Sequence, residues 1–132
     1  MTKLFRVILP VSDVDAAARF YGSVLGQAGS RVSEGRHYFD CEGTILACFD
    51  SKREDGYEAK PNPEPLYLAV DDLESVFAAV GRAGGVLSSA RGGPEGAMGE
   101  IEMRPWGERS FYADDPFGNP LCFVDRKTMF TG

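Results

Sequence analysis

The sequence predicts an α+β fold made of two similar βαβββ modules, and three observations point to it. The order strand, helix and three strands occurs twice along the chain. Two similar phrases, FDCEGTILACFD (39–50) and DDPFGNPLCFVD (114–125), each place a glycine between an acidic stretch and an apolar run that ends in Asp. The length of 132 residues suits one domain, or two small halves that share a core.

The first module is predicted over residues 3–50. Its first strand is the apolar run LFRVILPV (4–11). The next segment, SDVDAAARFYGSVLG (12–26), is predicted to be a helix because Ser12 or Asp13 can cap it and a glycine ends it. Three short strands that meet at Gly-containing turns complete the module, at residues 28–33, 37–41 and 44–50.

Residues 51–64 are charged and rich in proline, which predicts a linker. The second module is then predicted over residues 65–126. It begins with the strand LYLAV (66–70) and a helix over residues 71–85, capped by one of two consecutive aspartates. Its remaining elements are a short strand VLSSA (86–90), a Gly-rich loop expected to be mobile (91–100), and two strands (108–114 and 120–125).

The two modules can be matched position by position, which indicates an internal repeat. One module alone leaves a curved sheet with an unburied face, whereas two modules can enclose a cleft, a usual place for a ligand. The chain is therefore predicted to be a single domain, residues 1–132, whose curved mixed sheet cups a ligand cleft. The matched pairs are Val11 with Val70, Val14 with Leu73, Gly43 with Gly118, Leu46 with Leu121, and Asp50 with Asp125.

Composition and charge exclude several classes of protein. A net charge of −6 argues against nucleic-acid binding, which requires a basic surface. No apolar run approaches the roughly 20 residues that span a bilayer, and the apolar N-terminal run is too short for a secretory signal. Three cysteines without a CxxC pair are typical of reduced thiols. We therefore expect a cytoplasmic protein that binds neither nucleic acid nor membrane.

Three phrases carry a resemblance to a known family: PVSDVDAAARFYGSVLG (10–26), LAVDDLESVFAAV (68–80) and PWGERSFYADDPFGNPLCFVD (105–125). With the repeat, they cover nearly the whole chain. The chain resembles the vicinal oxygen chelate superfamily, which includes glyoxalase I, bleomycin-resistance proteins, fosfomycin-resistance proteins and extradiol dioxygenases. The resemblance implies paired βαβββ modules, a U-shaped sheet that cups a site, and usually a homodimer.

Enzymes of that family commonly bind a divalent metal through four side chains, typically His, Glu or Gln, one from each of four strands. The resemblance puts these positions at Arg6, Ala47, Pro65 and Cys122. Arginine has no lone pair to offer, alanine and proline cannot ligate, and one cysteine does not hold a metal. We therefore predict no metal of the family type and no cofactor.

The alternation of side chains along strands predicts what lines the cup. Phe5, Val7 and Leu9 suit a helix-covered face, so Arg6 and its neighbours on the other face point into the cup. The resulting lining is mostly apolar and aromatic, with one strong charge: Leu4, Arg6, Ile8, Ile45, Ala47, Phe49, Tyr67, Ala69, Pro120, Cys122 and Val124.

Seven residues are candidates for ligand binding. Arg6 can anchor a carboxylate or phosphate, or else form a salt bridge at the rim. Trp106 lies in a Pro-Trp-Gly run similar to one in bleomycin-resistance proteins, where aromatic residues help form the drug groove; the alternative is a Trp that closes a loop onto the core. Four aromatic candidates could stack on a planar ligand or simply fill the core: Phe39, Phe49, Tyr67 and Phe111. The seventh candidate is Cys122, which faces the cup.

No catalytic residue is predicted. His37 is the one imidazole, but it lies by a turn without a second catalytic group and is expected at the surface. Cys122 is expected to pack as a small apolar residue, although an activated thiol near Arg6 is an alternative.

The preferred function is a metal-free protein that binds a small molecule, either antibiotic-like or an aromatic or anionic metabolite. Two alternatives stay open. One is a metal-dependent lyase, isomerase or dioxygenase of the glyoxalase type, and the other is a dimeric protein without a ligand.

Overall fold

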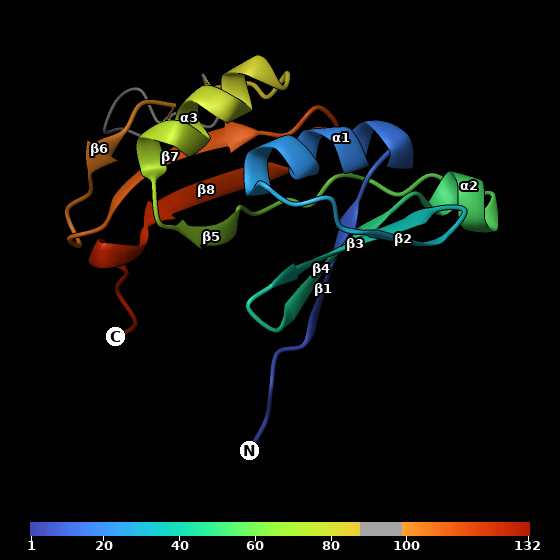
Figure 1. Ribbon diagram of the computed structural model, residues 1–132, viewed down its shortest axis with the longest axis horizontal. Coiled ribbons are helices and arrows are strands. Elements are labelled where there is room, and N and C mark those ends of the chain that lie inside the picture. Colours follow the sequence, from blue (N-terminus) through green and yellow to red (C-terminus); the bar gives the residue numbers. More distant parts are fainter. Residues whose placement is uncertain (88–98) are drawn as a thin grey trace. The chain divides into compact units, whose positions relative to one another are not determined.

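A computed structural model describes residues 1–87 and 99–132 of the chain (Figure 1). The chain forms two compact units, Met1–Asn62 and Pro63–Gly132, which we call unit one and unit two. Each unit contains one four-stranded sheet of parallel and antiparallel pairs, with helices. The predicted α+β class is confirmed. In the described ranges, no helix has the length and apolar character needed to cross a membrane.

Unit one is built from four strands and two helices. The sheet order is β1-β4-β3-β2, in which β1 runs parallel to β4 and the other pairs are antiparallel. Helix α1 packs on β3 and β4. The elements are β1 (Arg6–Pro10), α1 (Val14–Leu25), β2 (Ser30–Ser33), β3 (Arg36–Cys41), β4 (Thr44–Phe49) and α2 (Ser51–Asp55).

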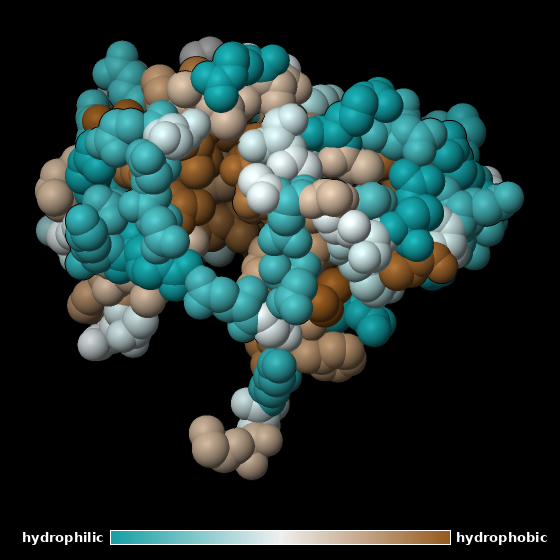
Figure 2. All heavy atoms as spheres, in the orientation of Figure 1, coloured by the Kyte–Doolittle hydropathy of each residue, from teal (hydrophilic) through white to brown (hydrophobic). Residues whose placement is uncertain are grey.

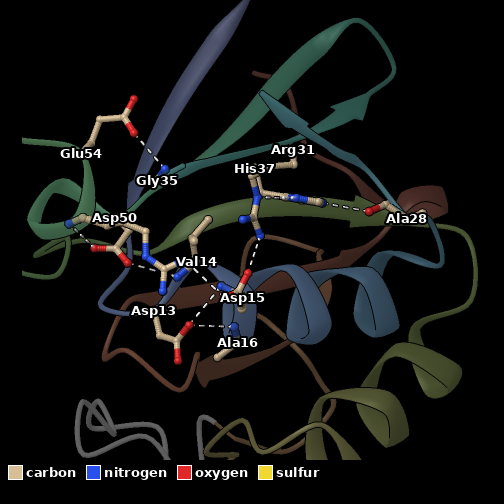
Figure 3. Close-up of polar contacts among 11 residues, drawn as sticks. Asp13, Val14, Asp15, Ala16, Ala28, Arg31, Gly35, His37, Asp50 and Glu54 are labelled. Carbon is tan, nitrogen blue, oxygen red and sulfur yellow. Dashed lines mark hydrogen bonds and ion pairs between the residues drawn. The ribbon is translucent and has the colours of Figure 1, made fainter. Parts of the chain in front are cut away.

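Helix α1 begins and ends where the sequence predicts. The carboxylate of Asp13 accepts hydrogen bonds from the N–H groups of Asp15 and Ala16, which caps the first turn (Figure 3). Gly26 ends the helix with a φ of 69°, a conformation that glycine adopts without strain. The buried stripe includes Tyr21, whose ring lies 6.3 Å from that of Phe39 in β3, measured between centroids. One face of the sheet is thus covered by α1.

The predicted linker, residues 51–64, begins with a helix instead. Asp50 caps α2 and also accepts a hydrogen bond from the N–H of Val14, at 3.3 Å, so it ties α2 to the start of α1. Glu54 accepts a bond of 2.8 Å from the N–H of Gly35 in the turn between β2 and β3 (Figure 3). Asp50, just before the predicted linker, is therefore a helix cap, and Glu54, within it, anchors that turn.

Unit two repeats the plan of unit one. The sheet order is β5-β8-β7-β6, and β5 runs parallel to β8. Helix α3 packs on β7 and β8 (Figure 1). The elements are β5 (Leu66–Val70), α3 (Leu73–Arg82), β6 (Glu102–Met103), β7 (Arg109–Asp114), β8 (Pro120–Asp125) and a 3₁₀ helix, η1 (Arg126–Thr128).

One part of unit two differs from the expectation. Most of the predicted strand at 86–90 and of the Gly-rich loop at 91–100 lies outside the described residues. Val86 itself forms a single bridge to Asp114. The fourth strand described in the sheet is β6, which the sequence analysis did not predict because two residues carry no detectable alternation.

The strand registers confirm the internal repeat. Val7 pairs with Leu46 in unit one, and their counterparts Leu66 and Leu121 pair in unit two. The caps repeat as well: Asp13 and Asp72 cap α1 and α3, while Asp50 and Asp125 cap the helices that follow the last strand of each unit. Both units are therefore specified by the same local signals.

Candidate functional site

The strongest candidate site lies on the face of the unit-two sheet opposite α3, which we call the unit-two open face. Phe111 of β7 contacts Phe77 of α3, so its neighbours in β7 point the other way. The register places Tyr67, Cys122 and Tyr112 side by side in one row across β5, β8 and β7. In the view of Figure 2, hydrophobic residues of unit two gather over β8, below α3.

Two tyrosines lie on either side of Cys122. The ring centroids of Tyr67 and Tyr112 are 6.4 Å apart and the rings are nearly perpendicular, at 83°. Their hydroxyl oxygens are 3.3 Å apart, within hydrogen-bonding distance. Cys122 is only 1% exposed, whereas Tyr67 is 55% exposed. The row thus presents an aromatic surface to solvent with a buried thiol in its middle.

Cys122 and Tyr112 hold their protons more tightly than free side chains do. Burial raises the pKa of the Cys122 thiol to about 11, although hydrogen bonds with Ser110 and Tyr112 act in the opposite direction. Burial, and then the hydrogen bond with Tyr67, raise the pKa of the Tyr112 phenol as well. At neutral pH, Cys122 therefore carries an S–H group and is a poor nucleophile, which disfavours the alternative of an activated thiol.

Arg104 contacts two residues of β7, Ser110 and Tyr112. The sequence analysis did not single it out. Its side chain is buried; Nε donates to Ser110 Oγ and Nη2 to the Ser110 carbonyl, both at 3.0 Å. The guanidinium also lies over the Tyr112 ring, 5.3 Å from its centroid. The available signal was an arginine next to the Pro-Trp-Gly turn, but its role depends on contacts across β7.

Trp106 lies at the tip of the turn formed by residues 104–107. The N–H of Gly107 donates to the Arg104 carbonyl at 2.9 Å, and Gly107 has a φ of 97°. The indole is 46% exposed, and its N–H donates to Glu108 Oε1 at 2.8 Å. The indole N–H already has a hydrogen-bond acceptor, and the ring is partly exposed. The face of the ring can therefore contact a ligand.

Phe39 and Phe111 do not share a face with the other candidates. Both are fully buried; Phe39 packs on Tyr21 of α1 and Phe111 on Phe77 of α3. This corrects the expectation that they line a cup together with Tyr67. Strands β3 and β7 carry aromatic residues on both faces, so alternation alone could not assign which of them point toward the helices.

In unit one, the face opposite α1 carries two arginines that lie on aromatic rings. Arg6 lies over the rings of Phe5 and Tyr38, at 5.0 and 5.5 Å from the centroids, and Arg36 lies over Phe49 at 4.6 Å. Across the described ranges, no carboxylate pairs with Arg6, whereas Arg36 pairs with one in α2. Arg6 is exposed and keeps its hydrogen-bond donors available.

His37 is buried, not at the surface as expected. It lies within β3, where Nε2 is 2.9 Å from the Ala28 carbonyl and Nδ1 faces Nε of Arg31 at 3.4 Å (Figure 3). Since Nε2 must carry the proton to donate to the carbonyl, Nδ1 is the acceptor. Both ring nitrogens are thus engaged in holding β2 and the preceding turn, so His37 is not placed to act as a base.

Comparison with known proteins identifies the family. The model of the Glyoxalase/Bleomycin resistance protein/Dioxygenase superfamily matches residues 3–123. The chain belongs to this superfamily. No curated protein sequence matches it.

Solved structures of the superfamily show the same fold at low identity. A glyoxalase/bleomycin resistance protein from Albidiferax ferrireducens T118 is 20% identical, with a TM-score of 0.72, over 92% of this chain and 97% of that chain. A glyoxalase-related enzyme from Fulvimarina pelagi is 21% identical, with a TM-score of 0.74, over 100% and 94%. Lactoylglutathione lyase from Agrobacterium tumefaciens is 21% identical, with a TM-score of 0.63, over 96% of each chain. At these identities the likeness establishes the fold alone.

The positions at which superfamily enzymes hold a metal do not fit one here. Ala47 is fully buried, Pro65 precedes β5, and the Arg6 guanidinium rests on aromatic rings. Cys122 carries its proton at neutral pH. Within residues 1–87 and 99–132, no group of three or more His, Cys, Asp or Glu side chains is placed to hold a metal ion. No chemistry through a metal is derived from these residues.

The raised pKa of Cys122 predicts a loss of stability in alkali. The folded chain keeps this proton while the unfolded chain releases it, so the free energy of unfolding falls between about pH 9 and pH 11, by about 2 kcal/mol. Urea denaturation across this range should show the fall in the wild type. The Cys122→Ala variant should lack this component, and equal slopes in both proteins would contradict the assignment.

Proposed function

We propose that this member of the superfamily is a metal-free protein that binds a small organic molecule with a planar or aromatic part. The observation that carries the proposal is the unit-two open face. There, Tyr67 is 55% exposed, and its hydroxyl group already has Tyr112 as a partner. Trp106, in the turn between β6 and β7 of the same unit, is 46% exposed, and its indole N–H is bonded to Glu108. A surface of this kind offers ring contacts without a nucleophile or a base.

The position of Cys122 supports binding over catalysis. Superfamily enzymes use this position for a metal ligand, and here a neutral, buried thiol occupies it between two tyrosines. A protonated thiol and two phenols can donate weak or moderate hydrogen bonds to a ligand, but they do not activate water or hold a Lewis acid.

In unit one, Arg6 offers a binding position for an anionic group. Its guanidinium is exposed and lies on the rings of Phe5 and Tyr38, so its orientation is restricted before a ligand arrives. A guanidinium held flat in this way presents its paired donors to a carboxylate or phosphate at a smaller entropic cost. An antibiotic-like compound or an aromatic acid can carry an anionic group of the kind that Arg6 would bind.

Metal analysis and a ligand screen test the proposal together. Purified protein should contain no stoichiometric Ni, Zn, Mn or Fe, and the melting temperature should not change when these ions are added. In a screen of antibiotics and aromatic acids, a compound that binds should raise the melting temperature. A ligand at 100 times its Kd raises the free energy of unfolding by about 2.7 kcal/mol. A tightly bound metal would favour a lyase, isomerase or dioxygenase instead.

Tyr67→Ala is expected to weaken the binding of any aromatic compound found in this way. Loss of one ring contact costs about 1 kcal/mol, which lowers affinity roughly fivefold. Tyr57→Ala is the matched control, because Tyr57 is also 55% exposed but lies in unit one. Isothermal titration calorimetry measures both variants. Equal affinities for the two would place the ligand elsewhere.

A further inference from the structure

One carboxylate joins two distant parts of unit two. Glu108 Oε1 accepts the indole N–H of Trp106 at 2.8 Å, and Oε2 accepts the backbone N–H of Phe130 at 2.9 Å. Trp106 belongs to the turn between β6 and β7, whereas Phe130 belongs to the C-terminal segment after η1. The side chain of Glu108 therefore couples the position of the turn to that of the C-terminal segment.

The C-terminal segment is held in place by its own contacts. Asp125 caps η1 by accepting from the N–H of Lys127, and its carbonyl accepts from Thr128 Oγ1 at 2.9 Å. Thr128 Oγ1 in turn accepts from the N–H of Arg109, the first residue of β7, also at 2.9 Å. This brings the segment back beside the start of β7, next to Glu108. The Phe130 N–H thus reaches Glu108 from a defined direction.

Trp106 needs such an anchor to present one orientation. An exposed side chain at the tip of a turn samples its rotamers on the picosecond-to-nanosecond timescale unless a contact restrains it. The indole N–H has Glu108 as its acceptor, and a hydrogen bond to a charged carboxylate is stronger than one to a neutral group. The bond from Phe130 fixes the second oxygen, which leaves the carboxylate little freedom to turn away.

We propose that Glu108 is the residue that positions the Trp106 ring for ligand contact, and that the Phe130 N–H sets this position through Glu108. The inference rests on the proposed function for its ligand, but it predicts a property of the ligand-free protein. The C-terminal segment then contributes to ligand binding by fixing the orientation of Trp106.

Two substitutions at residue 130 isolate the backbone bond. Phe130→Pro removes the N–H, and Phe130→Ala removes the same ring but keeps the N–H. The preceding residue, Met129, has φ of −56° and ψ of 124°, a conformation that a following proline favours. Met129 therefore meets the requirement that proline places on the residue before it. Circular dichroism and the melting temperature confirm that both variants fold.

Trp106 reports the outcome directly because it is the one tryptophan in the sequence. We expect Phe130→Pro to raise the population of released indole about fivefold relative to Phe130→Ala, which is the loss of roughly 1 kcal/mol. Acrylamide quenching and time-resolved anisotropy of Trp106 fluorescence measure this population. Indistinguishable quenching and anisotropy in the two variants would overturn the role of the Phe130 N–H.

Glu108→Gln gives a second, independent measurement. The two N–H groups bind different oxygens of Glu108, and glutamine replaces one of these oxygens by an NH2 donor, so in the same position it can accept from only one of them. Its Trp106 fluorescence should resemble that of Phe130→Pro, while Glu64→Gln, an exposed glutamate in the same unit, should leave the signal unchanged. A wild-type signal in Glu108→Gln would refute the positioning role. If no ligand is found but these fluorescence changes occur, the proposed function fails and the positioning role stands.

Discussion

Replacing Gly29 by alanine is expected to destabilise the protein by about 3 kcal/mol, which lowers the melting temperature by roughly 10 °C. Gly29 has a φ of 66°, and an added Cβ would lie 2.7 Å from the Tyr38 carbonyl oxygen and 2.8 Å from His37 Nε2. These distances are too short for a carbon atom. Because one obstacle is the backbone of β3, the chain must move, and the bond between His37 and Ala28 moves with it.

Gly26→Ala separates the steric effect from the conformational one. Gly26 has a nearly equal φ of 69°, but an added Cβ would meet nothing within 4 Å. In this control, only the cost of placing alanine in the left-handed conformation should lower the free energy of unfolding, by about 1 kcal/mol. Urea denaturation followed by far-UV circular dichroism compares the two variants. If both lose the same stability, the close approach of Gly29 to β3 is not important.

Replacing Asp115 by alanine is expected to have a similar or larger effect, about 3 kcal/mol or more. Its carboxylate accepts from the N–H groups of Phe117 and Asn119 and from Asn119 Nδ2, at 2.8–2.9 Å. Asp115 is 2% exposed and Asn119 is fully buried, so water cannot simply replace the lost acceptor. The turn that leads into β8 would lose the contacts that define its shape.

The internal repeat supplies a control for this variant. Asp40 occupies the corresponding turn of unit one, but it accepts one bond at an exposed site, from Gly43 N–H at 2.7 Å. Asp40→Ala should therefore cost at most about 1 kcal/mol. Asp115→Asn keeps one acceptor oxygen and should fall between the two. Denaturation midpoints measured in urea test the order, and equal effects at residues 40 and 115 would contradict it.

The repeat could be predicted from the sequence because local signals carry it. The caps at Asp13 and Asp72 and the turn glycines at residues 43 and 118 depend on nearby backbone groups. Such interactions can be inferred from short stretches of sequence. The prediction of a linker failed at α2 because Glu54 contacts Gly35, in the turn before β3, and Arg36 of β3, which are distant in the sequence.

The candidate site could be predicted only in part. Alternation placed Arg6 and Ala47 on one face, and the register agrees with this. It could not show that Phe39 and His37 face α1, because β3 has large side chains on both faces. The roles of Arg104 and Tyr112 depend on contacts across strands that the order of residues does not reveal.

The burial of Ala47 and Cys122 makes it costly to introduce metal ligands at these two positions, whether by natural mutation or by design. Ala47 is fully buried, and Cys122 is 1% exposed between two tyrosines. Installing a single histidine or glutamate at either position would bury a polar group before its partner ligands exist, at a cost of about 1–3 kcal/mol each. Both substitutions together would cost about 2–6 kcal/mol, a large part of a typical total stability of about 5–15 kcal/mol. A route from this chain to a metalloenzyme would therefore need changes in the packing around both positions.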